Sequence, residues 1–333
     1  MSNSFLESAG NWPHRFDENS RLIGFIPLSR EVHRSSTFAT DEHLPPNLPV
    51  TPVKIEEIEA AFAGRERVAH FVFHSAYCCS TMVARGFDVP GVSMGWKEPQ
   101  ILNDLLGWRR RGASQDEIRR GLESALSLLA RPFEAGETNV IKPSNIATPL
   151  ARDCLTLVPR ARAILLYAPI ESYLQSIAKK QLWGRRWVRE VLIGNIADGM
   201  LLSGFEEQNL LELTDLQVAA LGWLSQFALF KRLESEFGAD RVIIQDSASL
   251  LADTRSTMSK LYSHCGLELT ADQFEAALTG PAFTTHSKDA SASFSADDRA
   301  KEQADMAKLH GEEISLVAQW SQAVAQSQGF SIT

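Results

Sequence analysis

The chain has 333 residues, of which 44% are hydrophobic and 22% are charged, and its formal net charge is −8 at pH 7. This composition is typical of a globular protein with a sizeable core, and the acidic average argues against nucleic acid as the main partner. No apolar stretch approaches the roughly 20 residues of a membrane-spanning helix, and the N-terminus does not resemble a secretory leader. With four scattered cysteines, we expect a cytoplasmic protein without a membrane partner.

The first 53 residues are expected to form an irregular, proline-rich arm. The stretch "HLPPNLPVTPVK" holds four prolines, which disfavour both helices and strand ladders. Residues 54–333 are expected to form a single domain. It opens with a helix over 55–62 that ends at Gly64.

Strands and helices then alternate. Four short apolar runs predict buried strands: "RVAHFVF" (67–73), "TNVIK" (138–142), "ARAILLYAP" (161–169) and "DRVIIQ" (240–245). Helical patterns lie between and after them. Capping boxes at Ser114 and Thr214 open two of them, and Thr270 with Gln273 opens a third. Residues 183–240 are predicted to be a helical insertion. The fold class is therefore α/β, with a mostly parallel sheet flanked by helices.

The segment "HSAYCCST" (74–81) lies between the first strand and a predicted helix. Backbone N–H groups at such a junction, together with the helix dipole, bind phosphate. Small residues keep the backbone approachable, and the hydroxyls of Ser80 and Thr81 either cap the helix or bind phosphate oxygens. The glycines and the lysine of the pattern G-x-x-x-x-G-K-S/T are absent. The local residues therefore fit a phosphate cradle or an ordinary turn.

Four longer blocks add information: "VFHSAYCCSTMVAR", "PGVSMGWKEP", "VIKPSNIATPLARDCLTLVPRARAILLYAPIESYLQSIAKK" and "DRVIIQDSASLLADTRSTMSKLYSHCGLEL". Their order resembles that of the sulfotransferase family. The first block is similar to the family's 5′-phosphosulfate loop, and the second to a segment with an acidic residue. The third resembles a run of Lys-Thr-Pro, helix, strand and Arg-Asp-Pro, and the fourth a late strand, acidic turn and helix. The likeness spans about residues 67 to 270 and is greatest to bacterial sulfotransferase-like proteins of unknown substrate.

This resemblance implies a P-loop nucleotide-kinase-like, three-layer α/β/α fold. It implies 3′-phosphoadenosine 5′-phosphosulfate as donor, adenosine 3′,5′-bisphosphate as product, and no metal. The donor would contact Ser75, Ala76, Tyr77, Cys78, Cys79, Ser80, Thr81, Ser176, Lys180 and Lys288.

The chain departs from the family pattern at several of these positions. Tyr77 stands where the family usually has a basic residue, Cys79 where it has glycine, and Tyr167 where it has the arginine for the 3′-phosphate. The expected serine comes one residue late, at Ser176. Candidate replacement cations are Lys97, Lys142, Lys179, Lys180, Arg185 and Arg186.

Sulfuryl transfer requires an in-line acceptor, cations for the leaving group and a base for the acceptor proton. Glu98 is the predicted base, although a carboxylate here also suits a helix start. Lys142, at the end of the second strand, is predicted to neutralise sulfate. His74, the third candidate catalytic residue, could donate a hydrogen bond to a phosphate oxygen or form one with nearby backbone.

The acceptor is expected to be a small molecule bound near residues 183–240. Aromatic residues there (Trp183, Trp187, Phe205, Trp223 and Phe227) suggest a hydrophobic one, although the tryptophans also suit a core. Two alternatives remain open. One is an ATP-dependent P-loop kinase, for which Asp246 is the possible magnesium ligand. The other is a degenerate relative that binds another nucleotide or a partner without sulfuryl transfer. The sequence carries no signal of oligomeric state.

Overall fold

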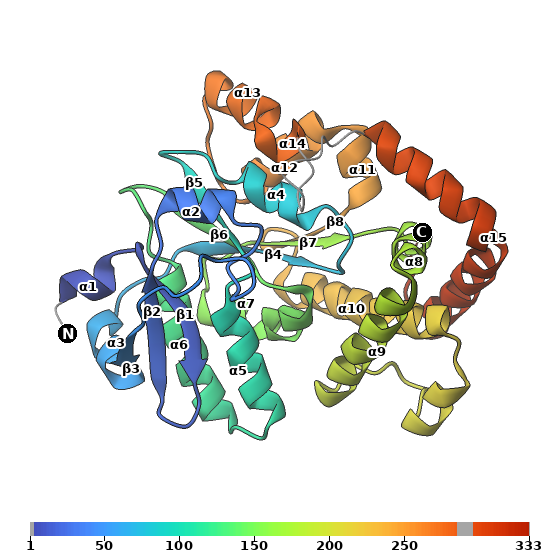
Figure 1. Ribbon diagram of the computed structural model, residues 1–333, viewed down its shortest axis with the longest axis horizontal. Coiled ribbons are helices and arrows are strands. Elements are labelled where there is room, and N and C mark those ends of the chain that lie inside the picture. Colours follow the sequence, from blue (N-terminus) through green and yellow to red (C-terminus); the bar gives the residue numbers. More distant parts are fainter. Residues whose placement is uncertain (1–2, 285–295, 333) are drawn as a thin grey trace. The chain divides into compact units, whose positions relative to one another are not determined.

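A computed structural model describes residues 3–284 and 296–332 (Figure 1). The chain packs as two units. The first unit comprises residues 1–73, 80–164 and 255–293, and the second comprises residues 74–79, 165–254 and 294–333. Within the described ranges, no helix combines the length and the apolar character needed to cross a bilayer.

The central sheet has five strands in the order β5-β6-β4-β7-β8. Their bounds are β4 (Ala69–His74), β5 (Ser93–Lys97), β6 (Thr138–Lys142), β7 (Ala163–Tyr167) and β8 (Val242–Asp246). Strand β6 pairs in parallel with both β4 and β5. Helices separate consecutive strands, so the α/β class predicted from the alternating pattern is confirmed.

Strand β5 was not among the four predicted strands. All five of its residues are buried, yet they include a serine, a glycine and a lysine, so no apolar run marks them. Helix α4 (Ser80–Gly86) packs directly on this strand. An added Cβ at Gly95 would lie 1.8 Å from the carbonyl oxygen of Ala84. The glycine therefore permits a backbone-to-backbone approach of helix and strand.

The expectation of an irregular arm was wrong. Residues 1–53 contain the helices α1 (Asn3–Glu7) and α2 (Arg30–Ser35) and the strands β1 (Asn11–Asp17) and β2 (Leu22–Pro27), and β3 (Thr51–Lys54) begins there. The strands form an antiparallel sheet in the order β1-β2-β3. The prolines are tolerated because Pro52 lies in an edge strand and Pro13 at an irregularity of the β1 register.

The remaining helices of the first unit surround its strands. They are α3 (Ile55–Phe62), α5 (Gln100–Arg110), α6 (Gln115–Leu129), η1 (Asn145–Leu150), α7 (Ala151–Leu157), α12 (Thr254–His264, whose first residue falls in the second unit), α13 (Ala271–Thr279) and α14 (Pro281–Thr284). The capping box predicted at Ser114 is present, with Glu117 as its partner. Gly86 of α4 lies against Met258 and Phe283, so α12 and α14 contact this helix.

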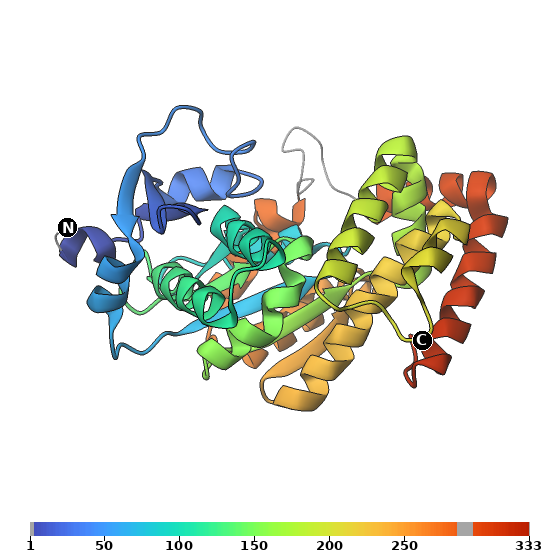
Figure 2. The same ribbon diagram turned by 90° about the horizontal axis from the view of Figure 1, so that it is seen from below.

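The second unit is mainly helical, as predicted for residues 183–240. It contains α8 (Ile170–Lys179), α9 (Gln181–Ala197), η2 (Glu207–Glu212), α10 (Asp215–Phe237), α11 (Ser247–Ala252) and α15 (Ala296–Ser327). Helix α10 packs against α8, α9 and α15, and Figure 2 shows the red α15 beside the green and yellow helices. The capping box at Thr214 is present.

Candidate functional site

Two lysines end the neighbouring strands β5 and β6, at the carboxyl ends of strands of the central sheet. Lys97 of β5 and Lys142 of β6 are register partners. The exposed fraction is 3% for Lys97 and 0% for Lys142. Buried lysines are rare unless they are paired. The carboxyl ends of strands are also where α/β folds bind ligands, so this edge is the candidate site.

Glu98 and Lys142, predicted separately, lie together. Lys142 Nζ donates to Glu98 Oε1 at 2.5 Å, and the Glu98 N–H donates to the Lys142 carbonyl oxygen at 2.7 Å. Glu98 has a φ of 55°, a left-handed conformation that is uncommon for a non-glycine residue. The Lys142 ammonium also lies 5.2 Å from the centre of the Phe38 ring. A strained turn thus holds a carboxylate against a fully buried cation.

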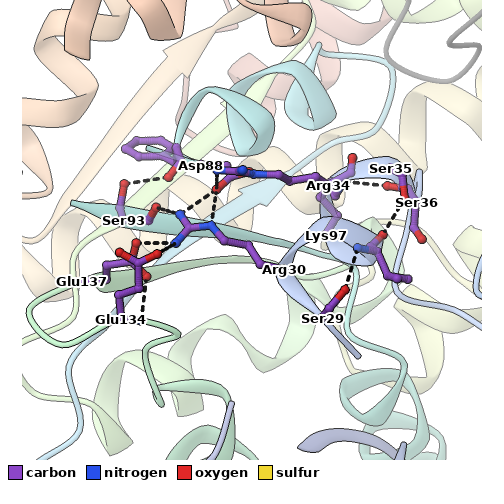
Figure 3. A network of polar contacts seen from close by, with 12 residues as sticks. Ser29, Arg30, Arg34, Ser35, Ser36, Asp88, Ser93, Lys97, Glu134 and Glu137 are labelled. Carbon is purple, nitrogen blue, oxygen red and sulfur yellow. Dashed lines mark hydrogen bonds and ion pairs between the residues drawn. The ribbon is translucent and has the colours of Figure 1, made fainter. Parts of the chain in front are cut away.

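Lys97, a candidate replacement cation, binds the N-terminal arm. Its Nζ donates to the carbonyl oxygens of Arg34 at 3.1 Å and Ser36 at 2.5 Å (Figure 3). Burial, followed by the positive charge of Arg85, lowers the pKa of Lys97 to about 7. The Lys97 ammonium thus donates hydrogen bonds to the backbone of the arm.

The loop that follows β4 has an unusual backbone. Ala76, Tyr77 and Cys79 have φ values of 68°, 53° and 61°, all in the left-handed region. Each such residue that is not glycine costs of order 1 kcal/mol or more. Cys79 is the position at which the family resemblance expects glycine. The loop therefore has the backbone conformation that glycine would favour, although no glycine is present.

Hydrogen bonds within the second unit anchor this loop to the end of β7. The Ser75 N–H donates to the Leu166 carbonyl oxygen at 3.0 Å, and Ser75 Oγ accepts the Ala168 N–H at 3.3 Å. The buried Cys78 thiol also donates to the Leu166 carbonyl oxygen, at 3.4 Å. The side chains of Ser75 and Cys78 thus hold the loop against the end of β7.

His74 and Tyr77 have structural contacts of their own. His74 Nδ1 accepts the Ala76 N–H at 3.1 Å. The side chain thus bonds to nearby backbone, which was one of the two roles predicted for it. Tyr77 packs edge-on to Trp187, with ring centres 5.6 Å apart, and lies 6.2 Å from Tyr173. Burial raises the pKa of Tyr77 to about 12, so the phenol is neutral at physiological pH. The loop therefore carries no cation at this position.

The other described donor candidates belong to both units, Ser80 and Thr81 to the first and Ser176 and Lys180 to the second. Ser80 and Thr81 are buried at the start of α4. Ser176 Oγ donates to the carbonyl oxygen one turn earlier in α8, at 2.8 Å. Lys180 is exposed at the junction of α8 and α9. Lys288 lies outside the described residues.

The tryptophans of the helical region differ from one another. Trp223 is buried and donates from Nε1 to the Ala168 carbonyl oxygen at 3.0 Å, as a core residue would. Trp183 is 60% exposed and stacks on Trp187 at 6.1 Å, so it is no core residue. Tyr167 packs on Phe227, with ring centres 5.0 Å apart.

Arg185 and Arg186, two of the candidate replacement cations, make ion pairs within the second unit. Arg185 lies 3.2 Å from Asp215, and Arg186 lies 3.1 Å from Glu190. Asp246, the possible magnesium ligand of the kinase alternative, caps α11 by accepting the Ser249 N–H at 2.7 Å. In the part of the chain that the structure describes, no three His, Cys, Asp or Glu side chains gather as a metal site would require.

Sequence reasoning did not find Phe38. It lies in the arm, far upstream of Glu98 and Lys142, and a single aromatic residue in a connecting segment carries no motif. Only the fold of the arm brings its ring to the Lys142 ammonium.

No protein-family model and no curated protein matches the chain. Several solved structures are similar to it. A sulfotransferase domain from the curacin biosynthetic pathway has 14% identity and a TM-score of 0.46, over 74% of this chain and 99% of that one. A sulfotransferase from Mycobacterium avium has 12% identity and a TM-score of 0.45, over 76% and 79%. The sulfotransferase domain of the Synechococcus PCC 7002 olefin synthase has 12% identity and a TM-score of 0.43, over 74% and 96%.

Proposed function

We propose that this chain is a sulfotransferase that moves a sulfuryl group from 3′-phosphoadenosine 5′-phosphosulfate to a hydroxyl or amine of a small molecule. The observation that carries the proposal is the ion pair between the fully buried Lys142 and Glu98. A cation and a base are the two side-chain functions that this reaction needs. The loop after β4, with its left-handed residues, supports the donor assignment.

Lys142 is assigned to charge stabilisation. Negative charge builds up on the oxygen that bridges sulfur and the 5′-phosphate as their bond breaks. An ammonium in a water-poor setting stabilises such charge far better than one in water, because the local dielectric is low. The side chain of Lys142 is 0% exposed, which provides that setting.

Glu98 is assigned as the general base. Its carboxylate takes the proton of the acceptor hydroxyl or amine while the acceptor atom attacks sulfur and the bond from sulfur to the phosphate oxygen breaks. The products are the sulfated acceptor and adenosine 3′,5′-bisphosphate. The backbone bond from Glu98 to Lys142 and the left-handed turn fix where the carboxylate lies, which is what a positioned base requires.

The loop over residues 75–79 is assigned to the donor's 5′-phosphate, through the backbone N–H groups of residues 77–79, since those of Ser75 and Ala76 donate to Leu166 and His74. The neutral Tyr77 supplies no charge there. Because a hydrogen bond to a charged group contributes about 1.5–3 kcal/mol, we expect weaker donor binding than in a loop with a lysine or arginine at this position.

Binding is tested by thermal unfolding with adenosine 3′,5′-bisphosphate, with ATP and 5′-AMP as controls. A ligand at 100 times its Kd stabilises the folded state by about 2.7 kcal/mol, which raises the melting temperature measurably. Lys142→Ala should reduce the shift, whereas the exposed Lys54→Ala should leave it unchanged. A shift with ATP alone would favour the kinase. The absence of a shift with every nucleotide would favour the degenerate relative.

Catalysis is tested with Glu98→Gln, which keeps the shape of the side chain and removes the base. We expect sulfuryl transfer to a panel of alcohols and amines to fall by about 10²–10⁴-fold, while the thermal shift with adenosine 3′,5′-bisphosphate persists. The measurement is transfer of label from the donor. Undiminished transfer in Glu98→Gln would remove Glu98 from the mechanism.

A further inference from the structure

The N-terminal arm reaches the Glu98–Lys142 pair through residues 36–41, here called the strap. The Ala39 N–H donates to the Lys97 carbonyl oxygen at 2.7 Å, and the Ala39 carbonyl oxygen accepts the Gln100 N–H at 3.3 Å. Lys97 and Gln100 flank the dipeptide of Glu98 and Pro99. The strap therefore runs along the turn that carries the carboxylate.

Phe38 of the strap covers the ammonium of the pair. Its half-buried ring is centred 5.2 Å from Lys142 Nζ, within the range of a cation–π contact. The same ring makes an edge-to-face contact with His43, with ring centres 4.9 Å apart. An aromatic side chain from the arm thus helps to keep Lys142 at 0% exposure.

The start of the strap is tied to the sheet by Lys97. The bonds from its Nζ to the carbonyl oxygens of Arg34 and Ser36 join β5 to the end of α2 and to the first strap residue (Figure 3). These are the carbonyl groups that a helix end leaves without helical partners. One buried ammonium therefore sets where the strap begins.

Helix α2 is also held by a partly buried ionic network, drawn in Figure 3. Arg30 lies 2.8 Å from Asp88 and also pairs with Glu137, whose side chain is 0% exposed. Arg34 lies 2.5 Å from the same Asp88. Arginine–carboxylate pairs of this kind give fixed geometry. The helix that leads into the strap is thus fixed to the segments beside β5 and β6.

The far end of the strap is held as well. Asp41 lies 2.6 Å from His14 Nε2 and 2.5 Å from Arg15, both of strand β1. The strap is therefore fastened before and after Phe38.

We propose that the strap is a wall of the reaction site, in which Phe38 determines which acceptors and how much water reach the Glu98–Lys142 pair, and Lys97 is the positioning residue that holds it. The part of this inference that concerns acceptors rests on the proposed function, and the covering of Lys142 does not. Because the wall is an aromatic ring, it favours a hydroxyl borne on an aromatic or apolar group over a sugar hydroxyl.

The covering is tested without any donor, by limited acetylation of lysines with peptide mass spectrometry. In Phe38→Ala we expect the acetylation rate of Lys142 to rise about fivefold or more, because a covering group is gone. Phe5→Ala is the matched control, since Phe5 is also half-buried in the arm but packs on Phe25. The exposed Lys54 is the internal standard. Phe38→Leu serves if the alanine variant melts early. An unchanged rate at Lys142 in both Phe38 variants would overturn the inference.

The role of Lys97 is tested with Lys97→Met. We expect faster acetylation of Lys142, as in Phe38→Ala, with an unchanged thermal shift on adding adenosine 3′,5′-bisphosphate. A general loosening of the protein would reduce the shift as well. A reduced shift with normal protection of Lys142 would instead make Lys97 a donor ligand and overturn its positioning role.

The acceptor wall is tested by comparing transfer to p-nitrophenol, to glucose and to water. In hydrolysis, water attacks sulfur and the bond to the phosphate oxygen breaks, which gives sulfate, adenosine 3′,5′-bisphosphate and a proton. Phe38→Ala should raise the ratio of hydrolysis to p-nitrophenol transfer several-fold, because water gains access. An unchanged ratio, or a wild-type preference for glucose, would contradict the proposed role of Phe38 in selecting acceptors. If the wild type neither binds the bisphosphate nor consumes donor, the proposed function fails while the acetylation result still decides the covering.

Discussion

Cys79 is a non-glycine residue in a left-handed backbone conformation. Its φ of 61° costs free energy that glycine would not incur. We therefore expect Cys79→Gly to stabilise the fold by about 1 kcal/mol, which raises the melting temperature by roughly 2 °C. Cys78→Gly is the control and should lower it, because Cys78 is fully buried and donates to the Leu166 carbonyl oxygen. A lower melting temperature for Cys79→Gly would show that its side chain outweighs the conformational cost.

The candidate site was predictable where a residue follows a recognisable strand. Lys142 ends the run "TNVIK", so its place at the sheet edge could be inferred. Glu98 was identified through the family resemblance, and its contact with Lys142 was not predicted. Phe38 and the bonds of Lys97 could not be inferred, because they depend on how a distant arm folds back. Tertiary contacts between segments far apart in the chain leave no local pattern.

At the scale of elements, the packing of α4 on β5 depends on Gly95. A Cβ there would lie 1.8 Å from the Ala84 carbonyl oxygen, and backbone cannot move aside as a flexible side chain can. Gly95→Ala should lower the free energy of unfolding by about 3 kcal/mol or more, measured in urea. Gly222→Ala in α10 is the control, since the nearest atom, Asn195 Nδ2, is 3.9 Å away. Equal urea midpoints for Gly95→Ala and the wild type would refute this account.

The elements that the sequence predicted share a strong local signal. Apolar runs identified β4, β6, β7 and β8, and the capping boxes at Ser114, Thr214 and Thr270 marked helix starts that the structure confirms. Strand β5 and the arm's antiparallel sheet were missed because their residues mix apolar side chains with glycine, proline and lysine. There, pairing with neighbouring strands outweighs local propensity.

At the scale of the whole molecule, the buried His70 makes the folded state less stable in acid. Burial and then the charge of Arg162 lower the pKa of His70 to about 4, and its Nδ1 accepts the Arg162 N–H at 3.0 Å. The unfolded chain therefore binds more protons between pH 6.5 and 4, and stability falls by about 3 kcal/mol as the pH drops through this window. His70→Asn, whose Oδ1 can accept the same bond, should make the loss of stability between pH 7 and pH 4, measured by urea unfolding, about 3 kcal/mol smaller than in the wild type. The exposed His43→Asn should keep it. A loss in His70→Asn as large as in the wild type would contradict this role of His70.

The ionic network around Arg30 links parts of the chain that lie far apart in the sequence. A product that began after residue 53 would retain Asp88 and the fully buried Glu137 but lose Arg30 and Arg34. Glu137 would keep backbone donors such as the Gly91 N–H, yet a buried carboxylate without its cation destabilises a fold by several kcal/mol. Changes in the first 53 residues are therefore expected to be coupled to changes at positions 88 and 137. In any lineage that shed the arm, neutral residues would have to appear at both acidic positions before or with the deletion.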